Sequence, residues 1–299
     1  MISVIICTHN PRSEYLTRAL DALAAQTLDR DKWELIVIDN ASTERLDKVL
    51  DLSWHPHSMV VRENELGLTP ARLRGIRESR GDVLVFIDDD NIPAADFIAS
   101  VERIALTKPE AGAWSGSVTP EFDEPPPEWT RRYWGNLVIR SIDGESWTRN
   151  YFDESTPLGA GLCVRRTVAN EYLRLHDEGL RNRMLDRAGN SLVSGGDNDL
   201  AACSLDLGMT VGVTPSLQLT HIIPRERLAE DYLLRLIESI AYSGMILRSF
   251  RAATPNPPPR RGAKKLVDVI RRARMSAREK RFVDAVKRGE TKARRELGI

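Results

Sequence analysis

The chain has 299 residues, of which 41% are hydrophobic, and it carries equal numbers of acidic and basic side chains. This length accommodates one large domain with appended helices or two small domains. No apolar run approaches the ~18 residues of a membrane span, and the N-terminus opens on a strand-like stretch, not a signal peptide. The three cysteines are far apart in apolar contexts, which favours buried thiols over a disulfide or zinc site. We therefore expect a cytoplasmic globular protein.

The zero net charge conceals an asymmetry between the two ends of the chain. Residues 260–299 carry 15 Lys and Arg against 5 Asp and Glu, so residues 1–259 are net acidic. A basic tail on an acidic body favours an anionic partner, either a membrane surface or, as the weaker candidate, nucleic acid. The alternative is a solvated helix that packs on the acidic body or on a second subunit. Peripheral attachment to the inner face of a membrane therefore stays open.

The first third of the chain alternates predicted strands and helices. Strands are expected at 3–7, 33–38, 59–61 and 83–87, and helices near 15–26, 45–50 and 70–79. This alternation is typical of right-handed crossovers in a parallel, Rossmann-like α/β sheet. Neither a G-x-G-x-x-G fingerprint nor a P-loop is present, so neither a dinucleotide site nor a P-loop site is supported.

Three consecutive acids follow the strand at 83–87. Asp88, Asp89 and Asp90 would lie at the carboxyl end of that strand, where open α/β sheets bind ligands. Clustered carboxylates repel one another and favour a bound cation, which would in turn neutralise nucleotide phosphates. The alternative interpretation is an acidic cap between strand and loop.

The second half of the chain is less regular. A helix is predicted at 97–106 and a strand at 113–118, followed by a segment at 120–157 that is rich in Pro, Trp and Tyr. Trp129 and Trp134 in this segment either line an acceptor or donor pocket or close a long loop by hydrophobic packing. Further elements are expected as a helix at 198–205, short strands at 209–213 and 216–220, a helix at 228–250, a linker near 253–262, and a basic amphipathic helix or helix pair at 263–297.

Five separated motifs occur in a characteristic order. They are Ser3–Asn10, Leu35–Ser42, Asn64–Arg72, Phe86–Asn91 and Gly195–Ala201. Together they resemble the motifs of family-2 glycosyltransferases of the GT-A fold over about residues 1–220. The resemblance implies a mixed, mostly parallel sheet flanked by helices. It also implies a domain at 1–225, divided into a nucleotide-binding half at 1–118 and an acceptor or catalytic half at 119–225, with a C-terminal helical extension at 226–299.

The same resemblance implies a site for a nucleotide-sugar donor. Its nucleotide-binding residues would be Thr8, His9, Asn10, Asp39, Gly67, Arg72, Asp88 and Asp89. Thr8 and His9 would border the base, and Asp39 would accept a hydrogen bond from it, typically from uracil. Asp88 would contact the ribose or assist the metal, and Arg72 would lie near the diphosphate. For Asp39 the alternative is an Asx-type turn with Ser42.

The resemblance further implies a metal site that holds Mn²⁺ or Mg²⁺. Asp90 would coordinate the ion, and His221, at a predicted strand end, would be a further ligand or else a structural histidine. Arg225 and Arg227 could then grip the diphosphate. Gly161 lies in a Gly-rich turn that would let substrate approach the backbone closely.

Asp197 is the candidate general base. An inverting transferase needs one carboxylate to remove the proton of the acceptor hydroxyl. The sequence departs from the family pattern here, because Gly196 stands where a Glu usually precedes this Asp. The alternative role for Asp197 is a helix cap, which Asp199 could share.

The leading hypothesis is therefore a metal-dependent, inverting glycosyltransferase. It would move a sugar from a nucleotide-diphosphate donor, most plausibly a UDP-sugar, to a hydroxyl of a saccharide or lipid-linked acceptor. One alternative is a degenerate GT-A domain that binds a nucleotide or a partner. A second is a sugar-nucleotide pyrophosphorylase, which is disfavoured because its Gly-rich opening loop is missing. The sequence leaves a homo-oligomer open.

Overall fold

The computed structural model describes residues 1–150, 155–181, 185, 187, 191–251 and 272–299. The strands are β1 (Ile2–Thr8), β2 (Trp33–Asn40), β3 (Ser58–Glu63), β4 (Val83–Ile87), β5 (Asn91–Pro93), β6 (Ala111–Phe122), β7 (Ser146–Thr148), β8 (Leu162–Arg165) and β9 (Thr210–Ile223). The α-helices are α1 (Ser13–Ala24), α2 (Leu68–Glu78), α3 (Phe97–Thr107), α4 (Arg166–Asp177), α5 (Gly196–Asp206), α6 (Glu230–Ser249) and α8 (Ala277–Leu297). Short 3-10 helices are η1 (Arg30–Lys32), η2 (Leu46–Lys48), η3 (Glu128–Leu137) and η4 (Arg225–Leu228). The predicted linker near 253–262 lies outside the described residues.

The strands form one mixed, mostly parallel sheet in the order β3-β2-β1-β4-β8-β6-β9-β5, with β7 paired to β9. Strands β3, β2, β1 and β4 are all parallel, and in this register Val4 lies between Leu35 and Val85. The carboxyl ends of β1, β2 and β4 therefore meet at one edge of the sheet. Strand β5 pairs antiparallel with β9 and places Asn91 opposite His221, which brings the end of β9 to the same edge.

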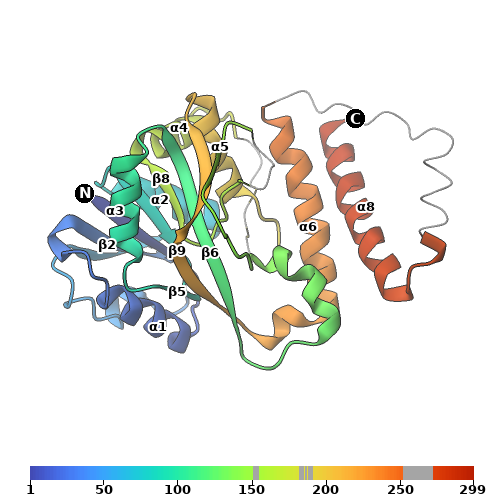
Figure 1. Cartoon of the computed structure of the whole chain (residues 1–299), viewed down its shortest axis with the longest axis horizontal. Helices are drawn as coiled ribbons and strands as arrows, with labels where there is room; N and C mark the ends of the chain where they lie inside the picture. The colour runs from blue at the N-terminus through green and yellow to red at the C-terminus, as the bar shows by residue number, and fades with distance from the viewer. Residues whose placement is uncertain (151–154, 182–184, 186, 188–190, 252–271) are drawn as a thin grey trace.

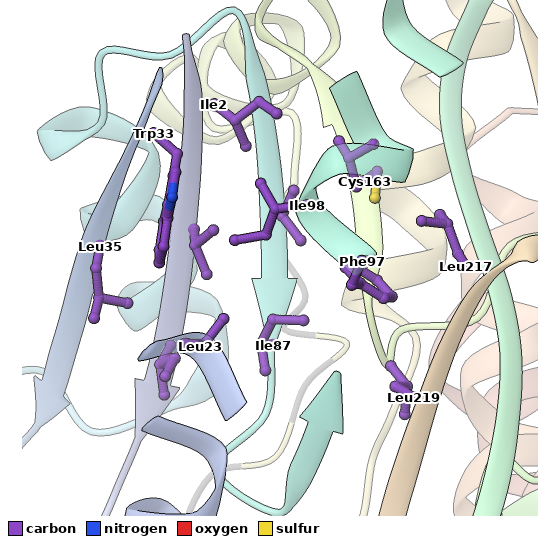
Figure 2. Close-up of a cluster of buried hydrophobic side chains, with 14 of the residues drawn as sticks. Ile2, Leu23, Trp33, Leu35, Ile87, Phe97, Ile98, Cys163, Leu217 and Leu219 are labelled. Carbon is purple, nitrogen blue, oxygen red and sulfur yellow. The ribbon is translucent and has the colours of Figure 1, made fainter. Parts of the chain in front are cut away.

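Both faces of the sheet are buried, which explains the uninterrupted apolar runs in its central strands. Alternate residues of β4 point to opposite faces: Val83, Val85 and Ile87 join one core cluster, whereas Leu84 and Phe86 join the other. Figure 2 shows the first cluster, in which side chains of β1, β2 and β4 pack with those of α1 and α3. Helices α2, α4 and α5 supply the second cluster on the opposite face. The result is a three-layer arrangement of helix, sheet and helix.

Helices α6 and α8 lie side by side at one end of the molecule, beyond the sheet (Figure 1). Phe282 and Ala285 of α8 are buried against α6, and a Cβ on Gly289 would collide with the carbonyl oxygen of Glu238. Basic residues of α8 pair with acids of α6; for example, Arg288 Nε lies 2.7 Å from Glu238 Oε2. This part of the basic tail therefore packs on the acidic body, one of the alternatives that the charge pattern left open. In the described part of the chain, no helix is both long and apolar enough to cross a bilayer.

Three sequence predictions need correction. The helix expected at 45–50 is only the short η2, because a single apolar side chain of this stretch, Leu46, is buried. The two strands expected at 209–213 and 216–220 are the single strand β9, whose pairing with β6 tolerates a register shift between Ser115 and Ser117. The segment at 120–157, expected to be irregular, contains η3 and β7.

Candidate functional site

A cavity of about 330 Å³ lies at the carboxyl edge of β1, β2 and β4, and we call it the central cavity. Its lining includes ten residues predicted from the sequence: Thr8, His9, Gly67, Arg72, Asp88, Asp89, Asp90, Asp197, His221 and Arg227. These residues come from six separate parts of the chain. The cavity therefore brings together the predicted metal, nucleotide and catalytic residues.

Asp88, Asp89 and Asp90, here called the aspartate cluster, follow β4 directly. Asp89 accepts a hydrogen bond from the Thr8 hydroxyl at the end of β1. Asp90 is buried, and its Oδ2 lies 2.9 Å from Arg227 Nη2 and 3.5 Å from His221 Nε2. Strand pairing fixes this arrangement, because the backbone oxygen of Asp90 accepts a hydrogen bond from the Ile222 amide at 2.9 Å.

The three carboxyl groups differ in their ionisation. Burial, together with the charge of Asp90, raises the pKa of Asp88 to about 6 and that of Asp89 to about 7. Burial would raise the pKa of Asp90 as well, but the Arg227 guanidinium, 2.9 Å from Asp90 Oδ2, holds it below its usual range. Near neutral pH Asp90 therefore carries a negative charge in a partly enclosed cavity, which favours a nearby cation.

The residues present fit a divalent cation. His221 Nδ1 lies 3.1 Å from the carbonyl oxygen of Leu137, so Nδ1 carries the proton and the Nε2 lone pair accepts from Arg227 Nη1 at 2.9 Å. Asp90 and His221 would supply one carboxylate and one imidazole, ligands that suit Mn²⁺ and, for the carboxylate, Mg²⁺. Among the described residues no three His, Cys, Asp or Glu side chains meet closely enough to hold a metal by themselves. The remaining ligands would therefore be phosphate oxygens and water, as is common for Mg²⁺.

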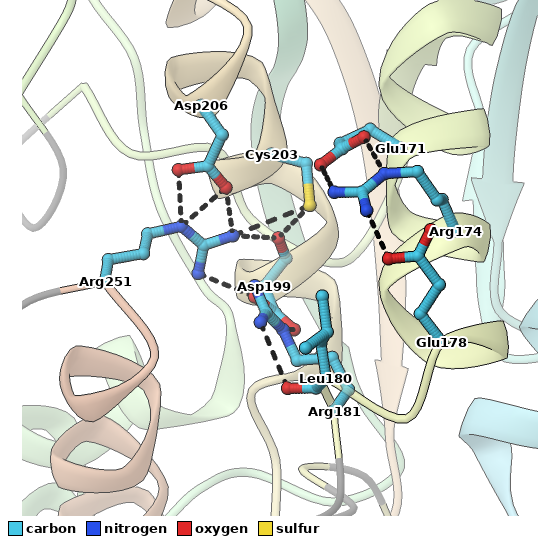
Figure 3. A network of polar contacts seen from close by, with 9 residues as sticks. All are labelled: Glu171, Arg174, Glu178, Leu180, Arg181, Asp199, Cys203, Asp206 and Arg251. Atoms are coloured by element: carbon cyan, nitrogen blue, oxygen red, sulfur yellow. Dashed lines mark hydrogen bonds and ion pairs between the residues drawn. The ribbon is translucent and has the colours of Figure 1, made fainter.

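Asp197 and Asp199 lie two residues apart in the first turn of α5 but occupy different environments. Asp197 lines the central cavity, and a Cβ on Gly159 would collide with its carboxylate. Asp199 is 2% exposed, and its carboxylate lies 2.7 Å from Arg181 Nε and 2.6 Å from Arg251 Nη1 (Figure 3). Asp197 is therefore the one of the two that can reach a ligand in the cavity.

The loops after β1 and β2 are held together by side-chain hydrogen bonds. Asn10 Oδ1 accepts from the Thr43 amide at 2.8 Å, and Asn40 Oδ1 accepts from the Gly67 amide at 2.8 Å. His9 Nδ1 lies 2.7 Å from the carbonyl oxygen of Asn40. These contacts place the His9 ring and the Gly67 backbone on the same wall of the central cavity.

Asp39 is 1% exposed, and it is not one of the described residues that line the central cavity. Its Oδ1 accepts a hydrogen bond from the Ser42 amide at 3.1 Å, as in the Asx-type turn that the sequence offered as an alternative. Its Oδ2 lies 2.7 Å from Arg62 Nη1. Burial would raise the pKa of Asp39, but the hydrogen bond from Arg62 lowers it. The hydrogen bond from Asp39 to a nucleotide base stays a prediction.

Five further predicted residues lie outside the described cavity lining, and one of them is Asn10, in the loop after β1. Arg225 is on the surface, with Nη1 3.2 Å from Glu124 Oε1. Gly161, at a φ of 66°, is packed against Leu219 and Phe97 in the core. Trp129 and Trp134 lie in a hydrophobic cluster with α6 and Phe282 of α8. For both tryptophans the structure therefore shows the hydrophobic closure that was one of the two interpretations.

Sequence reasoning missed several residues that line the central cavity. They are Cys7, Asn40, Leu66, Leu68, Ala71, Val138, Gly159, Ala160, Arg187 and Ser194. Arg187 matters most chemically, because its charge lowers the pKa of both Asp88 and Asp90. No periodicity or motif marks Arg187, although the run of basic residues around it, Arg181-Asn182-Arg183, could have drawn attention to this segment.

Comparison with known proteins supports the fold and identifies the family. The chain aligns over 172 residues, at 28% identity, with the glucosyl-dolichyl phosphate glucuronosyltransferase of Haloferax volcanii; this covers 56% of the chain and 53% of the relative. It aligns over 94 residues, at 38% identity, with the dolichol-phosphate mannosyltransferase of Pyrococcus furiosus, covering 30% of the chain and 25% of the relative. The aligned part of the chain thus spans about half the length of the first of these relatives and about a quarter of the length of the second.

The crystal structure of S. aureus TarS 1-349 in complex with UDP-GlcNAc superimposes with a TM-score of 0.52 at 14% identity. This match covers 99% of the chain and 92% of the TarS fragment, and it supports the predicted GT-A fold. The sequence model of the glycosyl transferase family 2 matches residues 3–167, which include β1 to β4 and the aspartate cluster. The chain therefore belongs to glycosyl transferase family 2.

Proposed function

We propose that this protein is an inverting glycosyltransferase that moves a sugar from a nucleotide-diphosphate donor to a hydroxyl of a saccharide or lipid-linked acceptor. The observation that carries the proposal is that Asp197 and the aspartate cluster face the same cavity. A carboxylate base and a diphosphate-binding group must both lie beside the anomeric carbon in a single displacement. Family membership supports the reaction class.

The donor would bind with its diphosphate among the cationic side chains of the central cavity. Arg72, Arg187 and Arg227 all line this cavity. Their charges would stabilise the diphosphate as its negative charge increases during departure. Asp90 and His221 would hold a divalent cation, which when bound supplies further positive charge to the leaving diphosphate.

Asp197 would act as the general base. The proton of the acceptor hydroxyl would pass to the Asp197 carboxylate while the hydroxyl oxygen attacks the anomeric carbon. The bond between that carbon and the β-phosphate oxygen breaks, and its electron pair leaves with the diphosphate. Attack from the side opposite the leaving group inverts the configuration. Gly159 supports this role because its missing side chain leaves room for the Asp197 carboxylate.

For the donor base we propose uracil, and for the acceptor a saccharide or a lipid-linked saccharide. The TarS structure with UDP-GlcNAc supports the first choice. Two relatives whose names include a dolichol-linked phosphate support the second. Association with an anionic membrane would then involve those basic side chains of α8 that are not paired with α6.

The proposal is tested by the thermal stability of the protein against nucleoside diphosphates and their sugars, each with Mn²⁺, Mg²⁺ or a chelator. A ligand that binds only the folded state raises the melting temperature. We expect a shift with UDP and its sugars in the presence of metal, and loss of that shift in Asp90→Ala. If no nucleotide shifts the melting temperature under any condition, the degenerate-domain alternative replaces the proposal.

A further inference from the structure

Arg227 bridges the two predicted metal ligands. Its Nη2 lies 2.9 Å from Asp90 Oδ2, and its Nη1 lies 2.9 Å from His221 Nε2. Arginine has only donors, so the guanidinium donates to both atoms. Nε2 is therefore an unprotonated acceptor, in agreement with the contact between Nδ1 and the Leu137 carbonyl oxygen at 3.1 Å. One carboxylate oxygen and one imidazole lone pair thus converge on a single internal cation.

A divalent cation would seek the same two atoms. Asp90 Oδ2 and His221 Nε2 are 3.5 Å apart, and their side chains are 8% and 7% exposed. The lone pairs that face the guanidinium cannot also bind a metal, and two cations in this space would repel each other. Arg227 has to leave these atoms before a metal can use them.

A bound diphosphate would offer Arg227 an alternative anionic partner. The guanidinium fork matches phosphate oxygens as well as it matches a carboxylate, and Arg227 already lines the central cavity together with Arg72 and Arg187. Its side chain is 23% exposed, on the short helical turn η4, and is therefore not enclosed by the core.

We propose that Arg227 is an internal counter-cation that holds the Asp90–His221 pair in the absence of donor and exchanges this pair for the donor diphosphate, so that metal and diphosphate bind together. The inference rests on the proposed function, because it assumes a diphosphate donor. It adds that Arg227 makes the metal affinity depend on the nucleotide. Such coupling is reciprocal, so the metal strengthens nucleotide binding by the same factor.

The test is Mn²⁺ binding, measured by electron paramagnetic resonance of the free ion and by calorimetry, without nucleotide and with saturating UDP. The proteins are wild type, Arg227→Gln, Arg227→Lys and the control Arg18→Gln. Arg18 is a matched control because it also pairs with a carboxylate, Glu121 at 2.7 Å, but on the surface of α1. Both measurements use the full chain, and neither depends on turnover.

We expect wild type and Arg18→Gln to bind Mn²⁺ weakly alone and at least tenfold more tightly with UDP. Arg227→Gln should bind Mn²⁺ alone about tenfold or more tightly than wild type, because the competing cation is gone, and UDP should add much less. Arg227→Lys, which keeps a cation without the bidentate fork, should lie between them. Removal of Arg227 also leaves Asp90 without its counter-charge, so the melting temperature of Arg227→Gln should fall and Mn²⁺ alone should restore it.

Equal affinity of wild type and Arg227→Gln for Mn²⁺ in the absence of UDP would overturn the inference. If UDP still binds with Mn²⁺ in that case, the proposed function stands without it. If UDP binds to none of the four proteins with or without Mn²⁺, the proposed function itself fails and the coupling fails with it. If Arg227→Gln does not fold, the comparison of wild type with Arg227→Lys decides by the same criterion.

Discussion

Asp199 and the aspartate cluster lie on different elements, and their negative charges are balanced differently. The carboxylate of Asp199 is paired with both Arg181 and Arg251, and it ties α5 to the loop after α4 and to the end of α6 (Figure 3). The aspartate cluster has one guanidinium in contact with Asp90, while burial and mutual repulsion raise the pKa of Asp88 and Asp89. A buried carboxylate that is paired on both oxygens stabilises the fold, whereas carboxyl groups with a raised pKa that face a cavity predict a ligand.

Asp197 faces the same cavity as the aspartate cluster, although it is closer in sequence to Asp199. It shares the central cavity with the aspartate cluster, and the bend of the chain at Gly195, with a φ of 157°, starts α5 so that Asp197 faces inward. Carboxylates that line the central cavity are thus distinguished from Asp199, whose oxygens face two arginines. Each of the following substitutions tests this distinction.

The largest effect is expected for Asp197→Asn. Loss of a general base lowers turnover by about 10³-fold, while the affinity for the donor stays within a factor of two or three. Single-turnover rates and donor binding measured on the same protein separate the two effects. Asp206→Asn, on the same helix and outside the described cavity lining, is the control and should keep its turnover. Turnover of Asp197→Asn within tenfold of wild type would contradict the assignment of the base.

Asp199→Ala should act on stability instead. The substitution removes the carboxylate that pairs with Arg181 and Arg251 and leaves both guanidinium groups without this partner, which lowers the free energy of unfolding by about 3–5 kcal/mol. Urea unfolding followed by circular dichroism measures the change. Glu178→Ala is the matched control, because its pair with Arg174 is 50% and 47% exposed and should contribute less than about 1 kcal/mol. Equal effects of the two variants would show that burial of the Asp199 ion pairs is unimportant.

His55 extends the comparison to a buried group that has no ion pair within the described part of the chain. It packs against Trp33 with ring centroids 4.1 Å apart, and burial lowers its pKa from 6.5 to about 4. Below pH 6.5 the unfolded chain binds a proton at this position that the folded chain does not, so stability falls as the pH falls from 6.5 toward 4. We expect a contribution of about 2 kcal/mol at pH 4.5 relative to pH 7.

The measurement for His55 is the pH dependence of the free energy of unfolding for wild type and His55→Gln. The variant should lose this part of the dependence between pH 4.5 and 7, even if its stability at pH 7 is lower. Parallel curves for the two proteins would show that the His55 pKa is close to its ordinary value. His57→Gln, with a side chain that is 44% exposed, serves as the control.

The smallest effect is expected for Asp88→Asn, and its sign is opposite to that of Asp199→Ala. Without metal at pH 7.5, removing one charge from the aspartate cluster relieves repulsion and should raise the free energy of unfolding by about 1 kcal/mol. Donor affinity should fall about tenfold, which calorimetry with UDP and Mn²⁺ would detect. Asp82→Asn, at a side chain that is 86% exposed, should change stability by less than about 0.5 kcal/mol. A destabilised Asp88→Asn would show that the cluster is balanced in the folded protein.

The strands around the aspartate cluster were predictable because their signal is local. A short run of Val, Leu, Phe and Ile that ends in three acids has few alternatives, and the observed β4 covers the expected residues 83–87. The meeting of Asp90 with His221 depends instead on the pairing of β5 with β9, which joins residues more than a hundred positions apart. Only the resemblance to a known family linked these two residues in advance.

The side chains that surround the cluster were harder to predict because their roles depend on packing. Arg187 lies in a segment without periodicity, so the sequence shows at most that this segment is basic and does not indicate that Arg187 reaches the central cavity. Trp129 and Trp134 have aromatic side chains, which suit either a sugar-binding surface or a hydrophobic core. Their contacts with α6 and α8 decide in favour of packing, and helix contacts of this kind cannot be deduced from the spacing of aromatic residues.

The most direct test of the account is a crystal structure of the protein with UDP and Mn²⁺. We predict that the diphosphate lies in the central cavity, that the metal contacts Asp90 and His221, and that Arg227 has moved from these two residues to the phosphates. The Asp199 ion pairs with Arg181 and Arg251 should be unchanged. Two results would contradict the distinction between the paired carboxylate of Asp199 and the cavity-facing aspartate cluster. One is a nucleotide bound elsewhere. The other is a diphosphate in the cavity that contacts neither the aspartate cluster, nor its metal, nor the surrounding arginines.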